Sequence, residues 1–463
     1  MLNNNKNFIW ASVERLALLC FQLFALLYLS RILSPYNFGL IAILNIFIAF
    51  SSVVIDSGMI GALIKKKHAK PIDYYTLFVY NFVLAILIYL ILFISAPFIS
   101  EFYEIPLLTN LVRVLSISLI INSFGYVQIV ILTKSYNFKA QSIITIISQS
   151  IAVTTSIFLA KKGFGVWSLV SLTLTHVVVS TLILIIYNKF IPRLKFSIIS
   201  FKEQFKFGGP LLISNILFII NTNIYSSLIG KFLSPMKAGY FYQSSKLTNT
   251  PTGVLSAIVD KVAFTILSKE EKKEQLILLG HNMYKSIYII VIPILLFTYV
   301  VSQDLFLILF NDDWIPAVKV FKILCLSLVP VLIRILNRNL LKSSGYTKTI
   351  LNVEIINSCL SICILFFTIS HGLNVVSYGI FFTNVIMAFL TVYYLNRKLN
   401  YKVFLQLSII IRPLTISLFL IILLKLILQE INFLNKLYEL IIFFFLFSFS
   451  YYVMNLRKIK IRL

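Results

Sequence analysis

The stretch Leu33-Ser34-Pro35, followed by Gly39, occurs again as Leu233-Ser234-Pro235, followed by Gly239. Each copy comes after one long apolar stretch and opens another. An internal repeat of this kind predicts a chain built from two similar halves. Two similar helical bundles can rock about a shared cavity, which is the geometry of alternating access.

The composition indicates that most of the chain lies in a membrane. Of the 463 residues, 59% are hydrophobic and 12% are charged, whereas soluble domains carry about 25% charged residues. The net charge of +25 falls mostly between apolar stretches, so it does not predict nucleic-acid binding. We find no phosphate-cradling loop, no metal-ligand cluster and no segment that resembles a soluble catalytic domain. We therefore expect a membrane protein that is not an enzyme and has no metal or cofactor.

The apolar stretches predict about fourteen membrane-spanning helices, because a bilayer requires roughly 20 residues for each span. The predicted fold class is an all-α polytopic membrane protein. The predicted spans are 8–30, 37–64, 75–100, 107–134, 142–160, 166–188, 207–230, 237–267, 282–309, 316–342, 348–369, 374–396, 405–428 and 436–455.

The repeat groups these spans into two pseudo-symmetric six-helix bundles around a central cavity, with two extra helices at the C-terminus. The predicted domains are residues 1–206, residues 207–398 and residues 399–463, the last ending in a short basic tail. A second motif supports the division, because Ile105-Pro106 and Ile315-Pro316 both open the fourth span of their half.

The basic residues predict the orientation. With a cytoplasmic N-terminus, the inside segments hold 24 lysines and arginines and the outside loops hold six. Basic residues accumulate in cytoplasmic loops, so both termini are expected to be cytoplasmic.

The eighth span carries a polar stripe. Its members recur at helical spacing and are Gln243, Lys246, Thr250, Gly253, Ala257 and Asp260. Lys261 adds a second cation, and Pro251 is expected to interrupt the helix within the membrane. We interpret the stripe as one wall of an aqueous cavity, because a charge buried in lipid is costly. The alternative is a kinked structural helix in which Lys246 pairs with a buried acid.

Other spans also carry polar side chains within the membrane. Glu14 and Arg15 lie in the first span, Asp56 in the second and Asn215 in the seventh. These residues are interpreted as lining the same cavity, and the alternative for Glu14, Arg15 and Asp56 is that they form ion pairs that hold the helices together. Arg334 and Arg338 lie near the inner end of the tenth span. Their side chains either extend to the membrane–water interface or contact a ligand.

Four segments carry a resemblance to a known family. They are residues 29–39, 61–67, 239–268 and 309–317. In this order and at this spacing the chain resembles the polysaccharide-flippase branch of the multidrug/oligosaccharidyl-lipid/polysaccharide exporter superfamily over nearly its whole length. The resemblance implies a V-shaped fold of two six-helix bundles around a central cavity.

The resemblance also implies a substrate and a location. Such proteins move undecaprenyl-pyrophosphate-linked oligosaccharide units across the bacterial inner membrane for O-antigen, capsule or exopolysaccharide assembly. A polysaccharide polymerase and a chain-length regulator are the expected partners. Arg15, Lys246 and Lys261 match the general pattern of cationic cavity residues in the family.

The sequence hypothesis is therefore a flippase that works by alternating access. Arg15, Lys246 and Lys261 are expected to hold the pyrophosphate. Asn, Gln, Ser and Thr side chains are expected to meet the sugar hydroxyls, and the polar cavity candidates with an amide or hydroxyl are Gln243, Thr250 and Asn215. Glu14, Asp56 and Asp260 are the candidates for coupling to H+ or Na+.

Three alternative functions are retained at this stage. A lipid II flippase and a multidrug or cation antiporter belong to the same superfamily. A membrane polysaccharide polymerase is the alternative from the enzyme class, although it would need a large outer loop.

Overall fold

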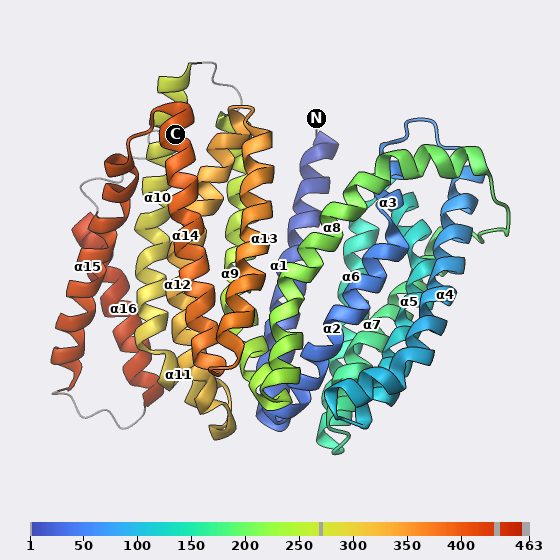
Figure 1. Ribbon diagram of the computed structural model, residues 1–463, viewed down its shortest axis with the longest axis horizontal. Helices are drawn as coiled ribbons and strands as arrows, with labels where there is room; N and C mark the ends of the chain where they lie inside the picture. Colours follow the sequence, from blue (N-terminus) through green and yellow to red (C-terminus); the bar gives the residue numbers. More distant parts are fainter. Residues whose placement is uncertain (1, 268–271, 430–435, 456–463) are drawn as a thin grey trace. The chain divides into compact units, whose positions relative to one another are not determined.

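The structure consists of helices joined by short connections (Figure 1). The computed structural model describes residues 2–267, 272–429 and 436–455, and all regular structure in these residues is helical. In chain order the helices are α1 Leu2–Ile32, α2 Pro35–Asp56, α3 Met59–Lys65, α4 Pro71–Tyr103, α5 Leu107–Lys134, α6 Phe138–Lys161, α7 Val166–Asn188, α8 Ile198–Phe232, α9 Pro235–Leu267, α10 Lys273–Val300, α11 Ser302–Leu309, the 3-10 helix η1 Asp312–Trp314, α12 Ile315–Ser343, α13 Thr347–Ile369, α14 Leu373–Leu399, α15 Val403–Gln429 and α16 Lys436–Asn455. The predicted all-α fold is confirmed.

Twelve helices in the described part of the chain are long and apolar enough to cross a bilayer, with α2 and α3 counted as one span. They correspond to twelve of the predicted spans. The remaining two predicted spans correspond to α9 and to α16, whose apolar part is the shorter segment Ile442–Tyr451. The chain is thus a multi-pass membrane protein, and the predicted number of about fourteen spans is approximate.

The span predicted at 37–64 is two helices rather than one. Ser57 and Gly58 have φ angles of 47° and 69°, in the left-handed region. A single left-handed residue ends an α-helix, because the hydrogen-bond ladder does not continue through it. The prediction missed this break because both sides of it are apolar.

The span predicted at 282–309 was placed too late in the chain. The structure has α10 from Lys273 to Val300, followed by the short α11. The first turns of α10 are polar on one side, but Leu276 and Gly280 on the other side are buried. A helix continues through polar residues when its other face is packed.

The predicted interruption of the eighth span is also corrected. The backbone of α9 stays helical through Pro251. Proline removes one backbone donor and crowds the preceding turn, which bends a long helix without ending it when flanking turns hold the rest of the ladder.

The chain forms two compact units, Met1–Tyr242 and Gln243–Leu463. The first unit contains α1 to α8 and the start of α9. The boundary predicted at residue 206 separates the two halves of the internal repeat, whereas the boundary after Tyr242 separates two compact units. The predicted boundary between the repeats therefore stays a prediction. The predicted basic tail, residues 456–463, lies outside the described residues.

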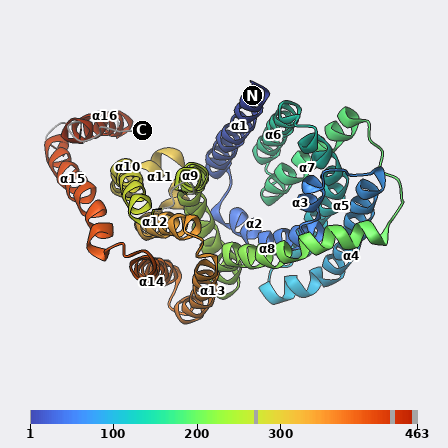
Figure 2. The same cartoon turned by 90° about the horizontal axis from the view of Figure 1, so that it is seen from above.

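Each unit has its own apolar core. In the first unit, buried side chains such as Leu44 of α2 and Leu111 of α5 pack together with α4 and α7. In the second unit, Leu336 of α12 and Leu395 of α14 belong to a core that also includes α10 and α15. Viewed from above, α15 and α16 lie beside α10 (Figure 2), where they pack against Phe297.

The two copies of the repeated turn lie directly against each other within the first unit. A Cβ atom on Gly39 would lie 1.7 Å from the carbonyl oxygen of Pro235. A Cβ atom on Gly239 would lie 2.0 Å from the carbonyl oxygen of Pro35. The contact is reciprocal because proline opens a helix in each copy, and glycine follows at the same spacing. The repeat therefore brings α2 and α9 into a backbone contact that only glycine permits.

We expect Gly39→Ala and Gly239→Ala each to destabilise the protein by at least about 1–3 kcal/mol, because the added methyl group would overlap backbone atoms. Thermal unfolding of the purified protein in detergent measures this effect. Gly61→Ala is the matched control, because a Cβ atom at Gly61 would have no heavy atom within 4 Å. Equal melting temperatures for Gly39→Ala and Gly61→Ala would contradict the prediction.

Candidate functional site

The two charged residues predicted in α1 lie on different sides of the helix. Glu14 is half-buried, and its carboxylate accepts hydrogen bonds from Ser142 and Thr145 of α6, both at 3.3 Å. Arg15 is exposed and makes no hydrogen bond or ion pair with any residue that the structure describes. Adjacent residues of a helix point in different directions, so Glu14 joins α1 to α6 whereas the Arg15 charge stays available.

Asp56 lies at the break between α2 and α3. Its Oδ1 atom accepts a hydrogen bond from the backbone N–H of Ile60 at 3.3 Å, which satisfies one of the free donors at the start of α3. Glycine is needed at the same break, because a Cβ atom on Gly58 would lie 2.6 Å from the carbonyl oxygen of Gly208 in α8. Asp56 therefore stabilises the helix break that receives α8.

Hydroxyl groups surround this break. The Ser57 hydroxyl is hydrogen-bonded to the Tyr80 hydroxyl at 2.8 Å, and the Ser52 hydroxyl to the Tyr126 hydroxyl at 3.0 Å. None of the ion pairs present in the described residues involves Glu14, Arg15 or Asp56. The alternative role of these residues as an ion-paired structural set is therefore not observed there.

The remaining candidate of the first unit is Asn215 in α8, and its side chain is exposed. α8 changes direction along its length (Figure 1), and Pro210 follows Gly208 within the helix. Proline and glycine together explain such a bend.

The candidates in α9 differ in burial. Gln243 is fully buried, Lys246 is exposed and Thr250 is half-buried. The side chains of Asp260 and Lys261 lie outside the described residues. The continuous helix preserves the spacing of the stripe, but the side chain of Gln243 is fully buried. A cavity lined jointly by the candidates of both units stays a prediction.

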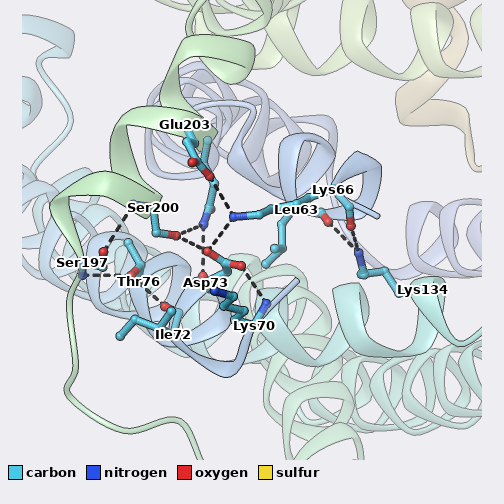
Figure 3. Close-up of polar contacts among 11 residues, drawn as sticks. Leu63, Lys66, Lys70, Ile72, Asp73, Thr76, Lys134, Ser197, Ser200 and Glu203 are labelled. Carbon is cyan, nitrogen blue, oxygen red and sulfur yellow. Dashed lines mark hydrogen bonds and ion pairs between the residues drawn. The ribbon is translucent and has the colours of Figure 1, made fainter. Parts of the chain in front are cut away.

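A polar network that the sequence did not single out joins α3, α4 and α8 (Figure 3). At its centre is Asp73, which is only 2% exposed. The Asp73 carboxylate accepts hydrogen bonds from Lys66 Nζ at 2.9 Å, from the Ser200 hydroxyl at 2.6 Å and from the backbone N–H of Lys70 at 2.8 Å. Lys66 also pairs with Glu203 at 2.8 Å.

Further contacts extend this network in both directions. Gln204 of α8 donates to the backbone carbonyl of Asp73 at 3.1 Å. Lys134 at the end of α5 donates to the carbonyl of Leu63 at 3.1 Å and to the carbonyl of Lys66. A cation at the carbonyl end of a helix is favourable, because the helix dipole is negative there. The network fixes the start of α8 and the end of α3 to the body of the first unit.

The electrostatics of the network favour a charged lysine. The side-chain hydrogen bond to Glu203 raises the pKa of Lys66 above its ordinary value, partial burial acts in the opposite direction, and Asp73 adds to the increase. In the sequence analysis, Lys65, Lys66, Lys67 and Lys70 counted among the basic residues that predict the orientation, and the first three also belong to a segment that carries the family resemblance. The one signal for the network was the single carboxylate, Asp73, that follows this basic run.

A profile of the family described as polysaccharide biosynthesis protein matches residues 28–319. The chain belongs to this family. The Bacillus subtilis teichuronic acid biosynthesis protein TuaB is 26% identical over 336 residues, which is 71% of this chain and 68% of TuaB. The succinoglycan biosynthesis transport protein ExoT of Rhizobium meliloti is 24% identical over 303 residues, which is 65% of this chain and 61% of ExoT. The family predicted from the sequence is confirmed.

Solved structures place the fold among membrane transporters. The lipid II flippase MurJ, in an inward closed conformation, matches with a TM-score of 0.78 over 98% of this chain and 99% of MurJ, at 16% identity. A multidrug resistance transporter of the MATE family matches with a TM-score of 0.64 over 85% of this chain and 98% of its own, at 16% identity. Together with the family match, these likenesses show a chain of the polysaccharide biosynthesis family that has the fold of membrane transporters.

We expect Lys66→Met to destabilise the protein by about 1.5–3 kcal/mol, because Asp73 would lose its charged hydrogen-bond donor. Unfolding in mixed micelles at pH 7 measures the loss. The raised pKa of Lys66 means that its contribution is complete at neutral pH and is lost only as the pH rises beyond the ordinary value of 10.5.

Glu203→Gln is the matched control for Lys66→Met, because it removes the exposed partner of the same lysine. The Glu203 side chain is 57% exposed, and exposed ion pairs contribute about 0–1 kcal/mol. A loss in Glu203→Gln as large as that in Lys66→Met would show that burial of Asp73 does not decide the effect.

Proposed function

We propose that this protein is a flippase that moves undecaprenyl-pyrophosphate-linked oligosaccharide repeat units across the bacterial inner membrane by alternating access. The exported units would supply O-antigen, capsule or exopolysaccharide assembly. The observation that carries the proposal is the polysaccharide biosynthesis family match over residues 28–319, in a chain with twelve described candidate spans.

The relatives support transport of a glycan carrier. ExoT is described as a transport protein of succinoglycan biosynthesis, and MurJ as a lipid II flippase. A lipid-linked oligosaccharide has a charged, hydroxyl-rich head and an apolar tail. Its head needs a polar path through the protein, whereas its tail can stay in the hydrocarbon.

In this proposal Arg15, Lys246 and Lys261 hold the pyrophosphate. Charge-assisted hydrogen bonds to phosphate are strong, and they gain strength where water is scarce. The exposed side chains of Arg15 and Lys246 support this role. Asn215 and Thr250 meet the sugar hydroxyls, whereas the fully buried Gln243 positions α9.

The proposed energy source is an ion gradient. Glu14, Asp56 and Asp260 are the proposed residues for coupling to H+ or Na+. One charge that crosses a potential of about 100 mV contributes about 2.3 kcal/mol, which is enough to bias a transport cycle. Asp56 is well placed to influence the helices, because it caps α3 at the break that packs against α8.

The proposed location is the bacterial inner membrane, with both termini in the cytoplasm. The network around Asp73 then lies at the cytoplasmic end of the first unit, next to Lys65, Lys67 and Lys70. A polysaccharide polymerase would receive the exported unit, and a chain-length regulator would act with it.

A lipid II flippase is the second candidate, because the fold matches that of MurJ over nearly the whole chain. Lipid II also carries a pyrophosphate, so the same cations would serve it. The two functions differ in phenotype, since loss of lipid II flipping stops cell-wall synthesis and loss of repeat-unit flipping stops display of one surface glycan.

Deletion of the gene is expected to abolish the surface glycan and to accumulate single lipid-linked repeat units inside the cell. Arg15→Ala combined with Lys246→Ala is expected to reproduce this loss at normal protein levels, because the pyrophosphate would lose two cations. Immunoblots of surface glycan and mass spectrometry of extracted carrier lipid measure both effects.

Lys319→Ala provides the control for this experiment, because it removes another exposed cation. Lys319 lies near the start of α12, far along the helix from Arg334. Its glycan display should equal that of the unmodified protein. Normal display by the double variant would rule out the pyrophosphate role of Arg15 and Lys246. Single units displayed outside a deletion strain would indicate a polymerase instead.

A further inference from the structure

Two arginines of α12 face α13 in the second unit. Arg334 and Arg338 are four residues apart, so they lie on the same side of α12. Glu354 and Asn357 are three residues apart and share one side of α13. α12 and α13 are consecutive helices that pack together, with only a short turn between them.

The contacts between these four side chains are sparse. Arg334 Nη1 donates to Asn357 Oδ1 at 3.0 Å, and Arg338 Nη1 donates to Glu354 Oε1 at 3.5 Å. The second distance is at the outer limit of a hydrogen bond. Neither guanidinium makes another hydrogen bond with the residues that the structure describes.

Arg334 and Arg338 lie well within α12, where an arginine with so few hydrogen-bond partners is unusual. Arg334 and Arg338 lie nine and five residues before Ser343, the last residue of α12, which corresponds to about 14 and 8 Å along the helix. Arg334 is half-buried, and its side chain contacts α13 and does not simply extend to the helix end. A cation at such a depth carries an energetic cost that is normally offset by an anionic partner.

The charges of the four side chains do not balance. Two guanidinium groups share one carboxylate, and the partner of Arg334 is a neutral amide. Each guanidinium has five N–H donors, and one donor of each is used by a described partner. The cluster therefore has an excess positive charge and many free donors on adjacent turns of one helix.

We infer that Arg334 and Arg338 form a binding site for the diphosphate group of a lipid-linked ligand. Guanidinium groups bind phosphate oxygens in pairs, and two guanidinium groups on adjacent helical turns can engage two linked phosphates. The inference deepens the proposed function, on which it rests for the identity of the ligand, and adds a second diphosphate-binding position to the one proposed at Arg15, Lys246 and Lys261.

Glu354 acts in this site as an internal competitor. Its carboxylate partly neutralises Arg338 while no ligand is present, which lowers the cost of keeping two like charges close together. An entering diphosphate would have to replace this contact and would be repelled by the carboxylate. The arrangement holds the arginines in place and favours release of the ligand after transport.

The variants of this cluster should change binding in opposite directions. We expect Arg334→Gln and Arg338→Gln each to weaken binding of farnesyl diphosphate at least tenfold, because each loses a cation with unused donors. Glu354→Gln keeps the shape of the side chain and removes the competing charge, so we expect binding several-fold tighter. The full-length protein in phosphatidylcholine nanodiscs, titrated with farnesyl diphosphate by calorimetry, measures both changes.

A loss of folding would weaken binding in every affected variant. It would not produce weaker binding in Arg334→Gln together with tighter binding in Glu354→Gln. Arg334→Lys retains the charge without the paired geometry, so its affinity should lie between those of the unmodified protein and Arg334→Gln. Arg412→Gln is the matched control, because Arg412 is exposed like Arg338, lies nine residues from the start of α15 and belongs to the same unit. Its affinity should stay within twofold of the unmodified protein.

Competing ligands show whether the site recognises a diphosphate group or phospholipid head groups in general. Inorganic diphosphate should displace the probe, and farnesol should not bind. Displacement by phosphatidylglycerol at equal concentration would show a general phospholipid site and overturn the diphosphate assignment. Unchanged binding in Arg334→Gln, or weaker binding in Glu354→Gln, would also overturn it.

The binding assay tests the diphosphate site, and the glycan-display assay tests the proposed flippase, so either hypothesis can be rejected without the other. Opposite effects of Arg334→Gln and Glu354→Gln together with normal glycan display in the deletion strain would retain the site and reject the proposed flippase. Lost display in the deletion strain together with unchanged binding in both variants would retain the flippase and reject this site.

Discussion

Hydrocarbon offers no hydrogen-bond partner, and this constraint decides where the polar groups of the membrane-spanning helices can lie. The backbone satisfies itself by forming helices throughout the described residues. Where a helix must break, polar side chains replace the missing partners. Asp56 accepts the Ile60 N–H at the start of α3, and Lys134 donates to the carbonyl of Leu63 near the end of α3. The short α3 is thus bonded by charged side chains at both ends, and this allows the chain to bend beside α8.

The degree to which a charge is satisfied separates structural from functional candidates. Asp73 receives three hydrogen bonds and is almost fully buried, as expected for a group that holds helices in place. Glu14, which is proposed for ion coupling, accepts two hydroxyl groups of α6 but is only half-buried. Arg15 is exposed without a described partner, and Arg334 and Arg338 use one donor each. Charges with unused bonding capacity are suited to a ligand, because the ligand supplies what the protein leaves open.

The internal repeat has a physical consequence in the first unit. Because both copies place a proline at the start of a helix and a glycine soon after, the two turns fit against each other through their backbones. A side chain on Gly39 or Gly239 would overlap the backbone carbonyl of the proline in the other copy. The same motif in both copies therefore supplies both sides of this contact.

The sequence by itself determined the all-helical fold, nearly every span and the family, because hydropathy and short motifs are properties of neighbouring residues. It also located Arg15 and Lys246, which the structure leaves exposed. It did not determine the break at Ser57, or that Glu14 faces α6. The network that joins Lys66 to Asp73 and Glu203 was likewise outside its reach, since Glu203 is distant in the chain. Only the tertiary structure decided these features, because the partner of a polar group in a membrane is set by which helices pack together, and that packing depends on contacts between residues far apart in sequence.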